Sequence, residues 1–218
     1  MYVSVGSSCN LCIEKDERRA AILKCSLTGN CTVYANGLRN AVGIAFDPET
    51  CSLWATENSR DYLGDNLPPD EINIIKEGRH YGWPYCYGKN IPDSEHNDKC
   101  NAREPSFIDL QAHSAPLGLA FNNGKNFHIK YLGDLFVAYH GSWNRKEKTG
   151  YKIVRINLGS NKVEDFAIGW LQNDKALGRP VDIIFDKEGV MYVSDDNAGV
   201  IYRIWMDRTG LIYSGGTR

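Results

Sequence analysis

The chain has 218 residues, with 25 lysine and arginine residues against 27 aspartate and glutamate residues, and its formal net charge is −2. This balance, without a basic run, argues against a nucleic-acid partner. No apolar stretch approaches the roughly 20 residues that a membrane span requires. No low-complexity linker divides the sequence, so we expect a single domain over residues 1–218.

One sequence unit recurs along the chain and sets the expected fold. It consists of a polar lead-in, an apolar strand ending in Phe, a turn rich in Asp, Asn or Gly, and a second strand. The first strands of its three copies are GIAF at 43–46, GLAF at 118–121 and DIIF at 182–185, and the second strands lie at 53–56, 135–138 and 191–194. Residues 1–5 match the second strand of a fourth copy. Such self-similarity indicates stacked or radial repeats.

A third strand is expected to complete each unit. Alternating apolar residues and β-branched or aromatic side chains favour strands, and no long helical period appears. The expected third strands lie at 21–24, 71–75, 151–156 and 200–204. About four antiparallel strands repeated around an axis form a β-propeller blade, so we predict an all-β propeller.

Seven cysteines point to an oxidising compartment. The Cys9/Cys12 and Cys25/Cys31 cluster and the Cys86/Cys100 pair could close local loops through disulfides that leave Cys51 free, and the connectivity stays open. A zinc site and unpaired buried thiols are the alternatives, although a four-ligand zinc site needs a second closely spaced pair, which residues 25 and 31 do not provide.

Polar residues gather where the first strand of each unit begins and the second ends, and in a blade these points share a face. The lead-ins carry Arg39-Asn40, His113 and Arg179, and the strand exits carry residues 57–60, 140–145 and 195–197. A ring of Arg, His and Asn suits an anionic small molecule, because guanidinium groups bind carboxylates bidentately. The alternative is a solvated mouth without a ligand. Trp143 and Tyr139 could stack on a flat ligand or serve packing alone.

Seven motifs in order resemble the glucose/sorbosone dehydrogenase family, the six-bladed propellers that use pyrroloquinoline quinone. The resemblance spans nearly the whole chain and is closest to the sorbosone-dehydrogenase-like branch. The motifs are VSVGSSC at 3–9, GLRN at 37–40, GIAFDPET at 43–50, PPDEIN at 68–73, HYGWPYCYG at 80–88, AYHGSWNR at 138–145 and GRPVDIIF at 178–185. The resemblance implies an incomplete arc of about three and a half to four blades, corresponding to the C-terminal portion of such an enzyme.

The resemblance also implies a function and a set of site residues. Sugar or related alcohol oxidation would pass hydride to the quinone. The implied cofactor-binding residues are Arg39, Asn40, Asn58, His140 and Arg179, whereas Val181 replaces a second cofactor-facing Arg. The backbone carbonyls of Ser59 and Arg60 would bind the calcium ion. Asp70 and Glu71 are an alternative metal-ligand pair, but we expect Asp70 to cap a turn and Glu71 to begin a strand.

The histidine that serves as catalytic base in the family falls before residue 1, so its region is missing from this sequence. His113 is the candidate substitute, although its blade approaches the mouth from another direction. We therefore expect a chain that is completed by N-terminal blades or by a homo-oligomer partner, in a periplasmic or secreted enzyme acting on a small sugar. Two alternatives stay open: a non-catalytic propeller that binds a carbohydrate or a protein, and a lactonase-like hydrolase.

Overall fold

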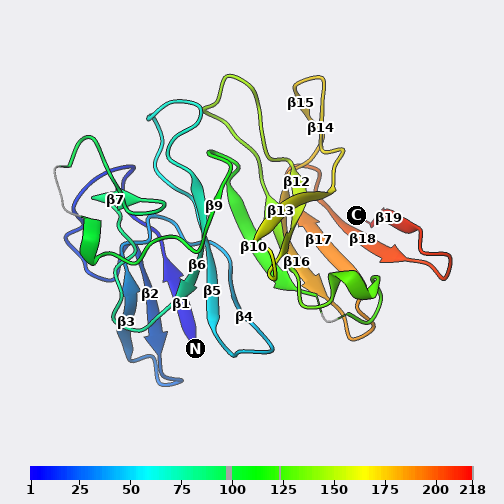
Figure 1. Cartoon of the computed structure of the whole chain (residues 1–218), viewed down its shortest axis with the longest axis horizontal. Coiled ribbons are helices and arrows are strands. Elements are labelled where there is room, and N and C mark those ends of the chain that lie inside the picture. The colour runs from blue at the N-terminus through cyan, green and yellow to red at the C-terminus, as the bar shows by residue number, and fades with distance from the viewer. Residues whose placement is uncertain (97–99, 123, 218) are drawn as a thin grey trace.

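The computed structural model describes residues 1–96, 100–122 and 124–217, and its regular structure is almost entirely β (Figure 1). Four antiparallel sheets account for most of the strands. In spatial order they are β1 (Tyr2–Val5), β2 (Ala21–Cys25) and β3 (Cys31–Asn36); β4 (Ile44–Phe46), β5 (Leu53–Glu57), β6 (Asp70–Ile75) and β9 (Ile108–Leu110); β10 (Pro116–Phe121), β11 (Leu135–Tyr139), β12 (Lys152–Asn157) and β13 (Lys162–Ala167); and β16 (Pro180–Phe185), β17 (Met191–Asp195), β18 (Val200–Met206) and β19 (Ile212–Thr217).

Short elements fill the connections between these sheets. Two hairpins pair β7 (Cys86–Tyr87) with β8 (Ile91–Pro92) and β14 (Leu171–Gln172) with β15 (Lys175–Ala176). The helical segments in the described part of the chain are two 3₁₀ turns, Cys100–Ala102 and Ile129–Tyr131. Among residues 1–96, 100–122 and 124–217, no helix has the length and apolar character needed to cross a bilayer.

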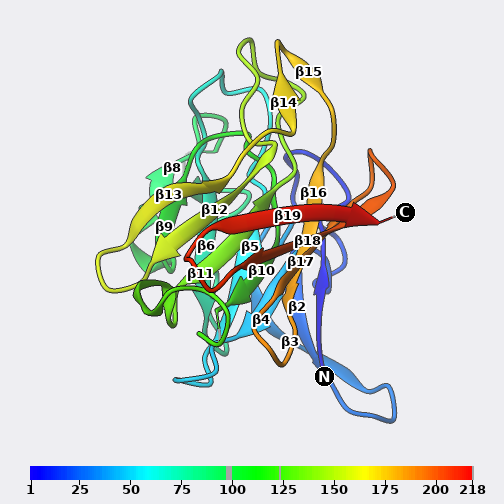
Figure 2. The ribbon, with the colours of Figure 1, turned by 90° about the vertical axis from the view of Figure 1, so that its right-hand side faces the viewer.

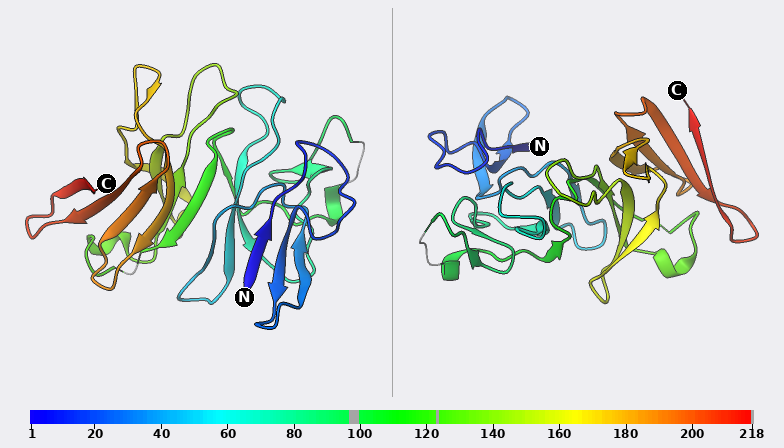
Figure 3. Two further views of the ribbon diagram at one scale, coloured as in Figure 1. Left: turned by 180° about the vertical axis from the view of Figure 1, so that it is seen from behind. Right: turned by 90° about the horizontal axis from the view of Figure 1, so that it is seen from above.

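The sheets follow one another in chain order from one end of the molecule to the other (Figure 1). Seen from above, they lie along an open curve with the first and last sheets at its two ends (Figure 3). The expected all-β class is confirmed, and each strand that the sequence predicts is present within a few residues of its expected bounds. The number of blades in the complete propeller stays a prediction.

Glycines let the first strands of neighbouring sheets approach each other through their backbones. A Cβ at Gly43 in the segment before β4 would collide with the carbonyl oxygen of Leu117 in β10. A Cβ at Gly118 in β10 would collide with the side chain of Asp182 in β16. Gly43, Gly118 and Asp182 occupy the first positions of GIAF, GLAF and DIIF. The first two copies carry glycine because the neighbouring strand lies too close to leave room for a side chain.

Each junction between consecutive sheets contains its own hydrophobic cluster. Ile22, Leu53 and Ile75 belong to the cluster between the first and second sheets. Trp54 and Leu119 belong to the one between the second and third. Phe136, Ile153, Met191 and Val193 belong to the one between the third and fourth. The sheets are therefore held face to face by burial of apolar side chains, as stacked blades require.

Three disulfides are present, which confirms the expectation of disulfides and gives the connectivity that the sequence left open. The bonds join Cys9 to Cys12, Cys25 to Cys31 and Cys86 to Cys100. Cys51 is free and exposed. Cys9, Cys12 and Glu14 lie close enough together to be considered as metal ligands. Because the sulfur atoms of Cys9 and Cys12 are bonded to each other in a disulfide, this group does not support the zinc alternative.

Phe136 provides a test of the junction between the third and fourth sheets. Its fully buried ring lies 4.7 Å from the ring of Phe166 and 5.6 Å from that of Phe185. We expect Phe136→Ala to lower the free energy of unfolding by about 3–5 kcal/mol, because it removes a large side chain and leaves a cavity. Urea unfolding followed by tryptophan fluorescence measures this change.

The matched control for Phe136 is Ile184→Ala. Ile184 lies on β16 in the same pair of sheets, and its side chain is 60% exposed. We expect a change of less than about 0.5 kcal/mol at this position. Equal losses in the two variants would contradict the assignment of the junction.

Candidate functional site

One polar pocket of about 210 Å³ lies where the ends of three sheets meet. It is lined from the second sheet by the segments around β4 and β5, from the third by those around β10 and β11, and from the fourth by the segment before β16. Nine residues singled out in the sequence line it: Arg39, Asn40, Asn58, Ser59, Asp70, His113, His140, Trp143 and Arg179. The arrangement of strands therefore brings residues separated by up to 140 positions into one cavity.

Arg39 holds the loop after β5 against the segment near the N-terminus. Its Nη1 donates to the carbonyl oxygens of Asn58 and Ser59, at 3.2 and 3.0 Å, and its Nε donates to the carbonyl oxygen of Asn10 at 3.2 Å. Its Nη2 lies 3.5 Å from Oδ2 of Asp61. The Ser59 carbonyl, a proposed calcium ligand, thus accepts a hydrogen bond from Arg39, and a cation there would have to share or replace that contact.

Two side chains tie the second sheet to the third at the pocket floor. Asn58 Nδ2 donates to the carbonyl oxygen of Pro116 at 2.6 Å. The carboxylate of Asp70 accepts from the backbone N–H groups of Ser59 at 3.0 Å and Ala115 at 2.9 Å. Both oxygens of Asp70 are therefore engaged with backbone donors, which is the capping role that the sequence predicted for this residue.

His140 links the third sheet to the fourth. Its Nδ1 lies 3.1 Å from Nη1 of Arg179, and its Nε2 lies 3.0 Å from Oδ1 of Asp196. Because a guanidinium can only donate, Nδ1 must accept, and the ring proton resides on Nε2 and is donated to Asp196. Arg179 also donates to the hydroxyl of Tyr151 at 3.0 Å and lies over that ring, 5.1 Å from its centroid. The His140 and Arg179 side chains are thereby held in fixed orientations.

The side chains of Arg60 and His113, both candidate site residues, make contacts that stabilise neighbouring loops. The Arg60 side chain is buried outside the polar pocket and pairs with Asp93 at 3.0 Å and Glu95 at 2.5 Å. His113 Nε2 lies 2.8 Å from the carbonyl oxygen of Gly64 and 3.1 Å from that of Leu67. Since carbonyl oxygens only accept, this nitrogen carries a proton and pins the loop before β6.

A pair of buried carboxyl groups, Glu57 and Glu71, lies outside the pocket lining. Glu57 Oε1 accepts from the backbone N–H of Arg39 at 2.7 Å, and Glu71 Oε1 accepts from that of Gly88 at 2.6 Å. Asn73 Nδ2 donates to the second oxygen of both, at 3.4 and 3.0 Å. Burial raises the pKa of Glu71 to about 7, and burial with the neighbouring Glu71 charge raises the pKa of Glu57 well above its ordinary value.

Asp61 and Asn144 are pocket residues that sequence reasoning did not single out individually. Asn144 Nδ2 donates to Asp61 Oδ1 at 2.6 Å, and the backbone N–H of Asp61 donates to Asn10 Oδ1 at 2.7 Å. Asn144 was included only within the 140–145 exit, whereas Asp61 lies one position beyond the 57–60 exit. The only sequence feature that could have pointed to Asp61 was its position in the long acidic loop between β5 and β6.

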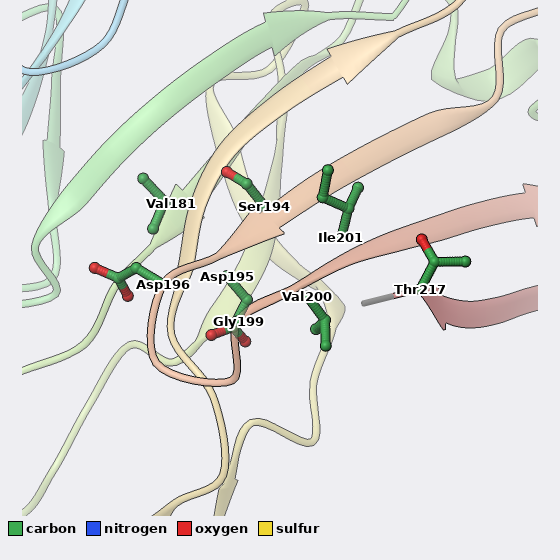
Figure 4. Close-up of a pocket in the computed structure, with 8 residues that line it drawn as sticks. All are labelled: Val181, Ser194, Asp195, Asp196, Gly199, Val200, Ile201 and Thr217. Atoms are coloured by element: carbon green, nitrogen blue, oxygen red, sulfur yellow. The ribbon is translucent and has the colours of Figure 1, made fainter.

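A second hollow, of about 440 Å³, lies on the fourth sheet (Figure 4). Val181, Val200 and Ile201 give it a mainly apolar lining, with the carboxylates of Asp195 and Asp196 at one side. In a side view, this sheet lies nearest the viewer at the end of the molecule, with β19 across its front (Figure 2). Its apolar character makes it a poorer seat for an anion than the polar pocket.

The TrAA12-like family model matches residues 89–207, which is more than half of the chain. The chain belongs to the TrAA12-like family. Among its relatives, an uncharacterised protein of Borreliella burgdorferi is 39% identical over 95% of this chain and 58% of that protein. A pyrroloquinoline quinone-dependent pyranose dehydrogenase of Coprinopsis cinerea is 26% identical over 79% of this chain and 31% of that protein.

A solved structure extends the TrAA12-like assignment to the fold. The calcium structure of a Trichoderma reesei AA12 carbohydrate-active enzyme superposes with a TM-score of 0.76 and 22% identity, covering 92% of this chain and 63% of that one. The resemblance to quinone-dependent sugar dehydrogenases is thus confirmed at the level of family and fold. The chain spans about three fifths or less of the length of these proteins.

The buried carboxyl groups predict a distinctive pH dependence of stability. Burial raises the pKa values of Asp70 and Glu71 to about 7 in the folded protein, so between about pH 4 and 7 the folded state binds more protons than the unfolded state. The free energy of unfolding should therefore fall as the pH rises through this window. Urea unfolding at pH 5, 6, 7 and 8 measures the slope.

Glu71→Gln isolates one of these groups. A neutral amide can still accept from the Gly88 N–H, so we expect the variant to lose up to about 1.4 kcal/mol per pH unit of that slope and to be more stable than the wild type at pH 8. The control is Glu188→Gln at an exposed position, which should leave the slope unchanged. A wild type whose free energy of unfolding rises from pH 5 to pH 8 would contradict the interpretation.

Proposed function

We propose that this protein acts in the oxidation of a sugar or related alcohol or aldehyde, with pyrroloquinoline quinone as hydride acceptor and Ca²⁺ beside it, as part of the full enzyme. The observation that carries the proposal is the convergence of Arg39, Asn40, His140 and Arg179 from three sheets on one polar pocket. Membership of a family with quinone-dependent relatives supports it. The hydride transfer itself would be supplied by the quinone.

The donor set of the pocket fits a planar tricarboxylate. Arg39 and Arg179 provide two guanidinium groups, and Asn40 and Asn58 provide amides. A guanidinium has five N–H donors, so the contacts of Arg179 with His140 and Tyr151 orient its side chain without exhausting it. Arg179 would hold a carboxylate of the cofactor, and the Asp196–His140 contact would keep the imidazole beside it.

A set of oxygen atoms at the pocket provides candidate calcium ligands, whose contacts with Arg39 a calcium ion would share or replace. The backbone carbonyls of Asn58 and Ser59 and the carboxylate of Asp61 are grouped around the Arg39 guanidinium. Ca²⁺ prefers such oxygen ligands and tolerates irregular geometry. We propose that Ser59 contributes its carbonyl, as the resemblance implies. Arg60 would contribute only its carbonyl, because its side chain is committed to Asp93 and Glu95.

The acceptor of the substrate hydroxyl proton is not assigned to His140 or to His113 Nε2. His140 accepts from Arg179 and donates to Asp196, and His113 Nε2 donates to two carbonyl oxygens. These engaged rings are the observation that favours the second candidate, a non-catalytic propeller that binds a carbohydrate or a protein through the same pocket. The three disulfides support a periplasmic or secreted location for either function.

Titration with pyrroloquinoline quinone, with and without Ca²⁺, tests the proposal. We expect saturable changes in the quinone absorbance that strengthen when Ca²⁺ is present. Arg179→Gln should weaken quinone binding at least tenfold, because it removes a positive charge and a bidentate donor. The measurement uses binding rather than turnover, so it does not depend on which group serves as the catalytic base.

The matched control is Arg203→Gln. Arg203 is an exposed arginine on β18 that lies 4.4 Å from the ring centroid of Trp205, away from the polar pocket. It should leave quinone affinity unchanged. No saturable binding in the wild type, or equal losses in both variants, would overturn the quinone proposal and favour the non-catalytic candidate.

A further inference from the structure

Two exposed aromatic rings stand beside the polar pocket. Trp143 is 66% exposed and lines the pocket, and Tyr62 is 71% exposed. Their ring centroids are 5.9 Å apart and their planes are perpendicular. Single exposed apolar residues are common on protein surfaces, but an adjacent exposed pair at the rim of a polar cavity is the kind of surface that contacts a ligand.

The two rings come from different sheets, and polar contacts rather than burial hold their loops together. Arg145 Nη1 donates to the Asp65 carbonyl at 2.5 Å, and its Nη2 donates to Asn66 Oδ1 at 3.2 Å. The backbone N–H of Lys146 donates to Asp65 Oδ1 at 3.2 Å. The Asn144–Asp61 contact adds a further tie next to the rings. The loop contacts thus fix the position of both rings in advance, which reduces the entropy that binding costs.

Tyr62 has a strained backbone conformation, which favours a binding role for its side chain. Its φ is +71°, in the left-handed region that bulky residues rarely adopt. Glycine would adopt this conformation without strain, yet the position carries a large aromatic side chain that is mostly in solvent. Strain of this kind persists where the surrounding structure enforces it and tends to mark ligand contacts.

We propose that Trp143 and Tyr62 form a stacking subsite for a pyranose ring of an oligosaccharide of at least two units. The face of a pyranose ring presents C–H groups that pack on an aromatic ring, while its equatorial hydroxyl groups point outward to polar neighbours such as Asp61. The terminal unit would lie at the mouth of the polar pocket, which the proposed function assigns to the quinone, and the aromatic pair would receive the next unit. This inference rests on the proposed function and narrows its substrate class from simple sugars to oligosaccharides.

The surroundings of the rings favour a saccharide over a purely apolar occupant. Trp143 shares the pocket lining with Asn144, His140 and Asp61, so a ligand stacked on the indole would meet hydrogen-bonding groups at its edge. Sugars require this combination of an apolar face and a polar rim. Tyr139, the other aromatic candidate from the sequence, is 2% exposed and belongs to a hydrophobic cluster, so it offers no such face.

The test measures saccharide affinity on the 218-residue protein without quinone, using glucose oligomers of one to four rings in β-1,4 and α-1,4 linkage. Trp143 is well suited as a reporter because Trp54, Trp83 and Trp170 are buried and the half-buried Trp205 lies on β18, outside the polar pocket. We expect at least tenfold tighter binding of two or more rings than of glucose, with quenching or a shift of the tryptophan emission. Saturation-transfer NMR on the sugar protons provides a readout that does not depend on the indole.

Three variants separate stacking from folding. Trp143→Ala should abolish the gain from the second ring, whereas Trp143→Phe should retain affinity within about threefold, because an aromatic face remains. The control is Tyr213→Ala, which removes a 42% exposed aromatic residue that stacks on Trp205 of the fourth sheet. It should bind saccharides as the wild type does. Near-UV circular dichroism and thermal unfolding verify that each variant is folded.

The outcomes distinguish this inference from the quinone proposal. Loss of the second-ring gain in Trp143→Ala supports the subsite even if the wild type fails to bind quinone. A wild type with no gain from a second ring overturns the subsite, and so does a Trp143→Ala protein that binds oligosaccharides normally. Weakened quinone binding with unchanged saccharide binding in Trp143→Ala would assign the indole to the cofactor seat instead.

Discussion

The close backbone contact between the first strands of neighbouring sheets is the constraint on which the candidate site depends. Gly43 lies against the backbone of Leu117, and Gly118 leaves room for the side chain of Asp182, so neither glycine position could hold a side chain of its own. Thr56 Oγ1 reinforces the first of these contacts by donating to the Leu117 carbonyl at 2.7 Å. Because the first strands lie this close together, the polar residues at the ends of the strands line one common pocket.

Polar cross-links turn this convergence into a defined pocket. Asp70 accepts backbone N–H groups from the second and third sheets, and the contacts of His140 with Arg179 and Asp196 join the third sheet to the fourth. The cost of this order is the burial of carboxyl groups that are harder to ionise, as the raised pKa values of Asp70 and Glu71 record. Such perturbed groups are common where a protein arranges charge for binding, although structural networks produce them as well.

Much of the fold followed from the sequence because the inner strands carry strong local signals. GIAF, GLAF and DIIF share their length and their terminal Phe, and the structure places them in equivalent positions of three sheets. The outer strands were not predicted individually. Residues 31–36, 162–167 and 212–217 lie at sheet edges, where polar and exposed side chains weaken the alternation that identifies a strand.

The candidate site was predictable as a set of residues but not as a set of contacts. The sequence placed Arg39, His113 and Arg179 on one face, because each precedes the first strand of its sheet and the strand direction determines the face on which that strand begins. It could not reveal that Arg60 turns its side chain into a buried ion pair with Asp93, because that partner lies in a distant loop. Nor could it show that the rings of Trp143 and Tyr62 meet, since 80 residues separate the two loops in the chain.

A crystal structure of the protein soaked with pyrroloquinoline quinone and Ca²⁺ tests the central claim most directly, namely that the converging strand ends form one anion-binding seat. The account predicts quinone density in the polar pocket, with a carboxylate at the Arg179 guanidinium and the cation near the Ser59 carbonyl. Quinone density confined to another surface, with the polar pocket filled only by solvent, would contradict it.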